Sequence, residues 1–263
     1  MPELAEVDYF RRQWNPGLGA RVLRVNLRPQ TRVFRGVQAA SFVRVVEGAT
    51  LETSECHGKQ MLFRLSGAGW LGIHLGMTGD MRVESARFDP APYDHLVLHQ
   101  RGRSLVFRDP RQFGRVRFHQ GAAPPDWWSN LPPTLLSRGF TCARMRAFLD
   151  RRRGTPIKAA LLMQEGFPGI GNWMADEALW RAGVDPRLRS GRLSEAASLA
   201  LYRAVRHVAA GAMRVMATEF RDPPPSWLFR HRWTPGGRCP RHHILLERAT
   251  IGGRTTVWCS ECQ

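Results

Sequence analysis

The chain has 263 residues, 43% of them hydrophobic, which is enough to bury one large core or two ordinary ones. Its 39 lysines and arginines outnumber 22 acidic residues, so the formal net charge is +17. This excess predicts a polyanionic partner, with nucleic acid first and an anionic membrane surface second. No apolar run of about eighteen residues occurs, so a membrane-spanning helix is not expected.

The chain begins Met1-Pro2-Glu3 without the basic and apolar stretches of an export signal. Removal of Met1 would expose the secondary amine of Pro2. A free α-amino group has a pKa of about 8, so part of it is an unprotonated nucleophile at neutral pH. Glu3 is then the nearest proton donor or acceptor. The alternative is a proline that merely precedes the helix expected over residues 4–14, which the sequence Asn-Pro-Gly ends.

Between about residues 21 and 119 apolar and polar residues alternate at period two. Short alternating stretches with Gly and Pro between them predict an antiparallel sandwich or barrel. Residues 121–139 hold two Pro-Pro pairs around Trp-Trp and are interpreted as the passage between two domains.

After residue 139 the pattern is helical. Thr155 as N-cap and Pro156 at the first position predict a helix that runs to Gln164, and Gly166 ends it. Further helices are expected over residues 172–182 and 195–218, and an irregular segment over 221–236.

Three of the five cysteines lie in the last 25 residues. Two residues separate Cys239 from His242, two residues separate Cys259 from Cys262, and sixteen residues lie between the two pairs. Two such pairs can close a tetrahedral site, and thiolate and imidazole ligands favour zinc. His243 follows His242 directly, so the sequence does not decide which of the two histidines is the fourth ligand. The alternative to a metal site is a reduced cysteine pair without metal. Four protein ligands leave no place for water, so a structural zinc ion is expected.

Several turns could hold phosphate. Gly252 to Thr255 is predicted as a hairpin turn that presents Arg254 outward, where a guanidinium can grip phosphate. The sequence GIGN at residues 169–172 combines glycines with a helix start, whose N–H groups favour an anion. Lys59 enters a strand just after a glycine. The alternatives are a solvated turn, a plain turn between packed helices and a strand-edge lysine.

Two further loops carry an apolar residue. Met77 lies in HLGMTG at residues 74–79, and Phe113 lies in DPRQFG at residues 109–114. Apolar side chains on the loops of a basic protein can act as wedges between bases. The alternative is that both belong to the core.

Taken together and in this order, these motifs resemble the formamidopyrimidine-DNA glycosylase/endonuclease VIII family. The resemblance covers essentially the whole chain. Met77, Arg111 and Phe113 match the trio that fills the gap left by a flipped base, which places the chain nearer the formamidopyrimidine branch. The resemblance implies an α+β multidomain fold: an N-terminal antiparallel β-sandwich with an N-terminal helix, a helix–two-turns–helix domain and a C-terminal zinc-finger β-hairpin.

These expectations divide the chain into four parts. They are a catalytic β-sandwich domain (1–120), an interdomain linker (121–139), a helix–two-turns–helix DNA-binding domain (140–220), and a linker with the zinc finger (221–263).

The resemblance also implies a bifunctional DNA glycosylase/AP lyase of base excision repair. Pro2 would attack C1′ of a damaged nucleoside and form a Schiff base, Glu3 would be the general acid/base, and β,δ-elimination would cut the strand. Lys59 is counted with the catalytic residues. The implied DNA-binding residues are His74, Met77, His95, Arg111, Phe113, Lys158, Asn172 and Arg254. Damaged double-stranded DNA is the expected partner of a monomer with one zinc ion, held by Cys239, His242, Cys259 and Cys262, in the bacterial cytoplasm.

The chain departs from the family pattern at several positions. Ala5 stands where Pro is usual, Gln112 replaces an Arg, and His242 replaces a zinc-binding Cys; Trp-Met also replaces the usual Ile-Tyr after Asn172. Residues 218–238 are short and proline-rich where a longer loop usually caps oxidised guanine. The lesion therefore stays open among 8-oxoguanine, ring-opened purines, oxidised pyrimidines and abasic sites. A DNA-binding protein without catalysis and a zinc-bearing RNA-binding protein are the alternative functions.

Overall fold

A computed structural model describes all 263 residues and divides into two compact units. Unit 1 comprises Met1–Pro2 and Glu6–Leu131, and unit 2 comprises Glu3–Ala5 and Pro132–Gln263. None of the helices combines the length and apolarity that crossing a bilayer takes.

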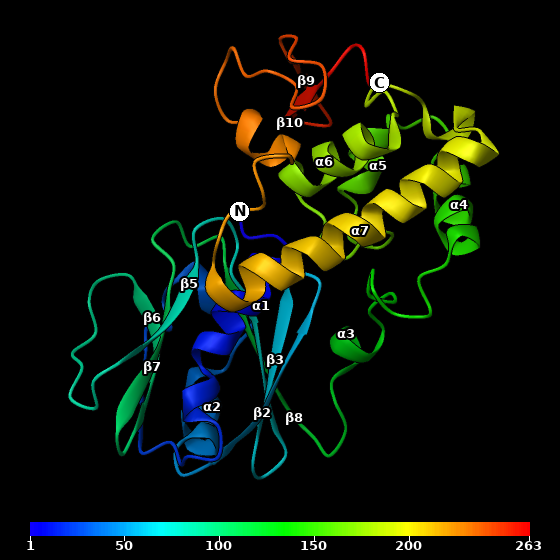
Figure 1. The fold of residues 1–263 in the computed structure, drawn as a ribbon. Helices are drawn as coiled ribbons and strands as arrows, with labels where there is room; N and C mark the ends of the chain where they lie inside the picture. Colours follow the sequence, from blue (N-terminus) through cyan, green and yellow to red (C-terminus); the bar gives the residue numbers. More distant parts are fainter. The chain divides into compact units, whose positions relative to one another are not determined.

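Unit 1 is a sandwich of two antiparallel sheets of four strands each (Figure 1). The first sheet has the order β1-β6-β7-β5, with strands β1 (Arg24–Leu27), β5 (Asp80–Glu84), β6 (Asp94–Gln100) and β7 (Arg103–Arg108). The second has the order β2-β3-β4-β8, with β2 (Leu51–His57), β3 (Gln60–Leu65), β4 (Gly69–His74) and β8 (Arg115–Gln120). The period-two alternation therefore predicts the fold class correctly, and the structure selects the sandwich over the barrel.

The core of unit 1 lies between the two sheets, because alternate side chains of each strand point inward. Met61 and Phe63 of β3 and Leu98 of β6 are fully buried there. Helix α1 (Leu4–Gln13) leads to Trp14, which is buried in the same core and donates from Nε1 to the carbonyl of Val106 at 3.2 Å.

Helix α2 (Ala39–Val46) interrupts the region for which only strands are predicted. Phe42 and Val46 lie four residues apart and are both fully buried in the sandwich core. A helix of this length covers too few turns for its periodicity to stand out from strand alternation. Short 3-10 turns complete unit 1 at Asn15–Gly17 and Arg32–Phe34.

Two tryptophans of the predicted linker belong to unit 1. Helix α3 (Asp126–Ser129) places Trp127 against Gly72 of β4, where an added Cβ would lie 2.3 Å from the indole ring. The guanidinium of Arg117 lies 5.1 Å from the centroid of the same ring. Trp128 packs edge-on to His57 with 5.9 Å between ring centroids. The first part of the segment 121–139 is therefore packed on the sheet.

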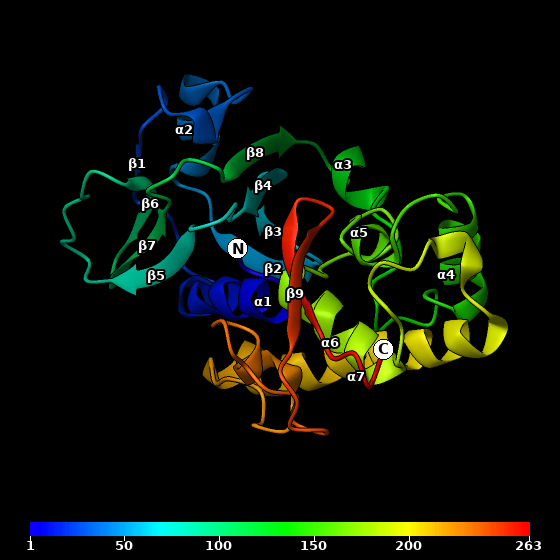
Figure 2. The ribbon, with the colours of Figure 1, turned by 90° about the horizontal axis from the view of Figure 1, so that it is seen from above.

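Unit 2 combines helices with a two-stranded hairpin. The helices are α4 (Cys142–Asp150), α5 (Ile157–Leu161), α6 (Asn172–Ala182) and α7 (Glu195–Glu219), with 3-10 turns at Ser190–Arg192 and Leu228–His231; the hairpin is β9 (Glu247–Ile251) and β10 (Arg254–Trp258). Helix α7 is one continuous rod that packs along α6 (Figures 1 and 2). It begins at Ser194, whose hydroxyl accepts from the N–H of Ala197 as an N-cap.

Helix α5 differs from its predicted bounds at both ends. Pro156 rather than Thr155 is the N-cap, and the helix ends at Leu161 rather than at Gln164. The carbonyl of Thr155 accepts from the N–H and the hydroxyl of Ser190, both at 2.9 Å, so Thr155 is tied to a distant segment. A tertiary contact therefore overrides the local capping signal.

Replacing Gly72 by Ala tests the packing of α3. Gly72→Ala is expected to destabilise unit 1 by about 1–3 kcal/mol, because the new methyl overlaps the ring of Trp127. Gly102→Ala is the matched control, since no heavy atom lies within 4 Å of its added Cβ. Thermal unfolding by circular dichroism measures both. Equal stability of the two variants would contradict the packing described.

Candidate active site and metal centre

The carboxylate of Glu3 is bound at the N-terminus of α6. Its Oε2 accepts from the N–H of Gly171 at 2.9 Å and of Met174 at 3.1 Å, and its Oε1 accepts from the N–H of Trp173 at 2.9 Å. Glu3 is only 3% exposed. Three donors and the positive end of the helix dipole favour the ionised carboxylate. An added Cβ at Gly171 would lie 2.3 Å from the carboxyl carbon, so this position requires glycine.

This arrangement corrects the interpretation of the GIGN turn. The sequence leaves two interpretations open, a phosphate contact through the free N–H groups of this helix start and a plain turn between packed helices; in the structure three of these N–H groups bind Glu3. The N–H of Leu4 also donates to the carbonyl of Gly169 at 3.0 Å. No periodicity or spacing reveals this pairing, because its partners lie far apart in the sequence.

One turn further along α6, Asp176 is buried between two cations. Its Oδ1 accepts from Lys158 Nζ at 2.5 Å, and its Oδ2 accepts from Arg232 Nη2 at 2.7 Å. The N–H of Val257 in β10 donates to the same Oδ2 at 3.1 Å. The three charged side chains are at most 3% exposed. Asp176 therefore joins α5, α6, the segment before the zinc cluster and the hairpin.

Two residues assigned to DNA contact are buried. Lys158 is fully buried, and its Nζ also donates to the carbonyl of Asn172 at 2.6 Å; burial lowers the pKa of Lys158, while Asp176 opposes this effect. His95 is 1% exposed, and its Nε2 bonds the carbonyl of Asp109 at 2.8 Å. Neither side chain presents its polar atoms at the surface. In the free protein both side chains support neighbouring residues, and their direct contact with DNA stays a prediction.

Asn172 and the turn before Arg254 are held close to one another within unit 2. Asn172 donates from Nδ2 to the carbonyl of Thr255 at 2.8 Å. The turn of the hairpin rests on α5, because an added Cβ at Gly252 would lie 2.7 Å from Cβ of Ala159. Arg254 opens β10 directly after this turn and is half-buried. The structure thus brings together two residues that the sequence assigns to phosphate.

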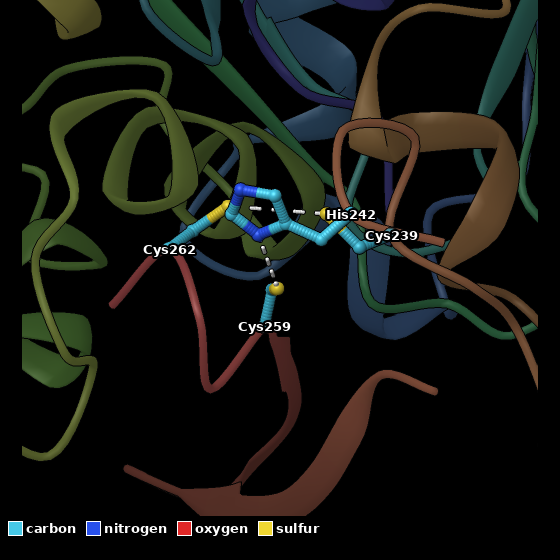
Figure 3. A group of neighbouring side chains, drawn as sticks. All are labelled: Cys239, His242, Cys259 and Cys262. Carbon is cyan, nitrogen blue, oxygen red and sulfur yellow. Dashed lines mark hydrogen bonds between the residues drawn. The ribbon is translucent and has the colours of Figure 1, made fainter. Parts of the chain in front are cut away.

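Four side chains at the C-terminus converge on one point (Figure 3). The ligand atoms of Cys239, His242, Cys259 and Cys262 all lie within 4.8 Å of one another. Nδ1 of His242 is 3.6 Å from Sγ of Cys259 and 3.5 Å from that of Cys262. The 3.8 Å between Sγ of Cys239 and Sγ of Cys262 is the separation expected of two thiolates at about 2.3 Å from a tetrahedral zinc ion.

The donor set therefore fits a structural zinc ion, and His242 rather than His243 is its histidine. Trp180 of α6 donates from Nε1 to Sγ of Cys239 at 3.4 Å and packs with Leu228 in a small core beside the cluster. Donors of this kind stabilise a thiolate and orient it toward the metal. The cluster is thus tied to the same helix that binds Glu3.

In unit 1, Asp109 joins the two loops that carry the predicted wedge. Its Oδ1 accepts from Thr78 Oγ1 at 2.9 Å, and its Oδ2 accepts from the N–H of Gly114 at 2.6 Å. The loops touch through their backbones, because an added Cβ at Gly76 would lie 2.4 Å from the carbonyl carbon of Phe113. Sequence reasoning did not assign a role to Asp109; its only signal was its place in DPRQFG.

The wedge residues themselves remain accessible. Phe113 is 43% exposed, and the guanidinium of Arg111 lies 4.8 Å from the centroid of its ring. Met77 is half-buried in the adjoining loop. The structure thus brings together the loops of all three.

Lys59 and His74 lie near each other, in a turn and at the end of a strand of the second sheet. Lys59 is 8% exposed and lies in the turn between β2 and β3, just before the strand that it was expected to enter. Burial lowers the pKa of His74 to about 4, and the positive charges of Lys59 and Arg117 act in the same direction. The N–H of Gly76 donates to His74 Nδ1 at 3.0 Å. The ring is therefore neutral, with its proton on Nε2.

Two family models match the chain in succession. The formamidopyrimidine-DNA glycosylase N-terminal domain matches residues 1–116, and the formamidopyrimidine-DNA glycosylase H2TH domain matches residues 131–223. The formamidopyrimidine-DNA glycosylase of Xanthomonas axonopodis pv. citri is 33% identical over 273 residues, which covers all of both chains. The chain belongs to the formamidopyrimidine-DNA glycosylase family. The relative from Thermus thermophilus is 34% identical over 278 residues, covering 100% of this chain and 98% of its own.

Solved structures agree with this family. The crystal structure of the MutM (Fpg) protein of Thermus thermophilus matches with a TM-score of 0.82 at 33% identity, covering 100% of this chain and 98% of that one. A Lactococcus lactis Fpg mutant in complex with DNA that contains Fapy-dG shares the fold, with a TM-score of 0.88 at 23% identity over 100% and 99% of the two chains.

Replacing Asp176 by Asn tests the buried charge network. Asp176→Asn is expected to destabilise unit 2 by about 3–5 kcal/mol, because two cations are left buried without a counter-charge. Asp185→Asn is the matched control: Asp185 pairs with Arg187 at the surface, so its change is expected to cost less than about 1 kcal/mol. Urea unfolding compares the two. Similar losses would show that the network is not what stabilises the unit.

The low pKa of His74 predicts a pH dependence. In the unfolded chain His has a pKa of about 6.5. Between pH values of about 6.5 and about 4, the unfolded chain therefore binds more protons at this residue than the folded protein does. The contribution of neutral His74 to the free energy of unfolding is therefore fully present above this pH range, and it is lost as the pH falls through the range. NMR titration of the His74 ring should show a neutral imidazole at pH 5.5. A midpoint near 6.5 would contradict the structure.

Proposed function

We propose that the chain is a bifunctional DNA glycosylase/AP lyase of base excision repair that acts on oxidised purines in double-stranded DNA. The observation that carries this proposal is the carboxylate of Glu3, held by three N–H groups of α6 one peptide bond away from the amine-bearing Pro2. The substrate class follows from relatives: their solved structures hold DNA with Fapy-dG and with carbocyclic 8-oxo-G.

The first chemical step uses the amine of Pro2, which removal of Met1 exposes. The unprotonated nitrogen attacks C1′ of the flipped-out nucleoside, and the damaged base departs. Ionised Glu3 accepts the proton of the amine and returns it to the ring oxygen O4′ as the sugar opens. The nitrogen and C1′ are then joined as an iminium, the Schiff base.

Strand cleavage follows from the charge of this iminium. It acidifies the protons on C2′, and loss of one expels the 3′ phosphate by β-elimination; a further proton loss expels the 5′ phosphate by δ-elimination. Lys59 is proposed to bring its positive charge close to these phosphates and to assist their departure. Asn172 and Arg254 of unit 2 are proposed to bind backbone phosphates, and so is neutral His74 of unit 1, which can donate from Nε2.

Met77, Arg111 and Phe113 are proposed to fill the gap that the flipped base leaves. Phe113 offers an exposed ring that can stack on a neighbouring base, and Arg111 lies beside it. A bound zinc ion would join the chain segment before β9 to the chain segment after β10, and it would in this way position Arg254 in the hairpin. Its three thiolate ligands must stay reduced, and for this reason we place the protein in the cytoplasm.

The choice of lesion depends on residues 218–238. Trp227, Leu228 and Phe229 of this segment are buried in unit 2, so the middle of the segment is packed rather than free. We therefore propose that ring-opened purines are excised at least as well as 8-oxoguanine, because a short segment offers little to cap an intact purine ring.

Borohydride trapping tests the nucleophile. The processed protein, incubated with a duplex that holds one formamidopyrimidine lesion, is expected to give a covalent adduct on the peptide that begins with Pro2. A form with residues added before Pro2 should give none, because its nitrogen is an amide. Mass spectrometry of the digested adduct locates the sugar.

Glu3→Gln should lower the trapping rate by at least about 100-fold, because the amide cannot carry the proton. Glu261→Gln, at an exposed acid near the C-terminus, is the control and should react normally. An adduct on a lysine, formed equally well by the extended protein, would overturn the assignment of Pro2.

A further inference from the structure

Three arginines line a hollow on the outer face of the sheet β2-β3-β4-β8. Arg35 follows the 3-10 turn Arg32–Phe34, and Arg115 and Arg117 project from the same face of β8. The hollow has a volume of about 240 Å³ and is also lined by Gln60, His74 and Phe113. All of these residues belong to unit 1.

The charges of these arginines are not balanced by acidic groups. None of the three takes part in any ion pair of the chain. Burial lowers the pKa of Arg35 and of Arg117, and neighbouring guanidinium groups lower both further. Like charges held together repel one another, so the hollow is a place where an anion would be stabilised.

Two of the guanidinium groups are already held in position. Arg35 donates from Nη1 to the carbonyls of Arg32 at 2.9 Å and Gly114 at 3.1 Å. Arg117 lies on the ring of Trp127, as described above. Groups held in this way lose little conformational freedom when they bind a ligand.

Arg115 supplies the unsatisfied donor. Its Nε is buried and has no hydrogen-bond partner. A buried donor left without an acceptor costs about 1–3 kcal/mol, and more when it is charged. An oxyanion in the hollow would remove this cost, and a guanidinium fork matches the oxygens of a phosphate.

The neighbours of the hollow indicate which anion it binds. Phe113, the exposed ring of the proposed wedge, forms part of its wall, and so does His74, which carries a proton on Nε2. A duplex that receives this wedge must bring backbone phosphates beside it. We propose that Arg35, Arg115 and Arg117 bind a backbone phosphate of the DNA next to the wedge. This inference rests on the proposed function, and it adds a phosphate site that does not involve the zinc hairpin.

The salt dependence of DNA binding tests the site. Each phosphate contact contributes about 0.9 to the slope of log affinity against log salt. Arg115→Gln is expected to lower this slope by about one and to weaken binding by about tenfold at low salt. Damaged and undamaged duplexes should be affected alike, because a phosphate carries no sequence information.

Arg44→Gln is the matched control, because Arg44 is exposed on α2 and its loss changes the net charge by the same amount. It is expected to leave the slope nearly unchanged. Arg115→Lys should retain part of the slope, since it keeps the charge and loses the fork. Thermal unfolding of each variant shows that the fold is intact.

The outcomes separate this site from the proposed chemistry. A wild-type protein that shows the expected salt slope but forms no borohydride adduct would reject the proposed function and leave the phosphate site standing, because the slope reports binding alone. Equal salt slopes for Arg115→Gln and Arg44→Gln would overturn the phosphate site. If, with equal slopes, inorganic phosphate raised the melting temperature of the wild type alone, the hollow would bind free phosphate and the assignment to DNA would be wrong.

Discussion

The bond between the Glu3 carboxylate and the start of α6 is the interaction on which the rest of the site depends. A buried carboxylate is costly unless its oxygens are satisfied, and three backbone N–H groups satisfy them here. Because Pro2 precedes Glu3 by one peptide bond, whatever holds the carboxylate also restricts where the amine proposed as the nucleophile can lie. A flexible chain end thereby becomes a defined reactive group.

Helix α6 extends this constraint along one face. Asn172, Asp176 and Trp180 are spaced four residues apart, so they project from the same side of the helix. They bond, in turn, the carbonyl of Thr255, the N–H of Val257 and the sulfur of Cys239. One helix thus holds the carboxylate proposed to be catalytic at its start, the hairpin along its middle and the zinc cluster near its end.

Unit 1 has a different role: it presents positive charge and an exposed aromatic ring on rigid loops. Asp109 holds these loops in place, because its carboxylate accepts hydrogen bonds from Thr78 in one loop and from Gly114 in the other. The arginines of β8 and of the 3-10 turn have no such acid beside them. Their mutual repulsion destabilises the free protein, and the phosphate that they are proposed to bind would relieve it.

The sequence by itself determined the sandwich class, the three zinc-binding cysteines and the family, because alternation, short ligand spacing and ordered motifs are local properties of the chain. It also placed Pro2 beside Glu3 and Phe113 in a loop. Only the tertiary structure decided that Glu3 occupies the GIGN helix start, that Lys158 and His95 are buried, and that His242 completes the metal site. Each of these depends on which distant segments pack together, and burial and long-range hydrogen bonds leave no periodic trace in the residues that make them.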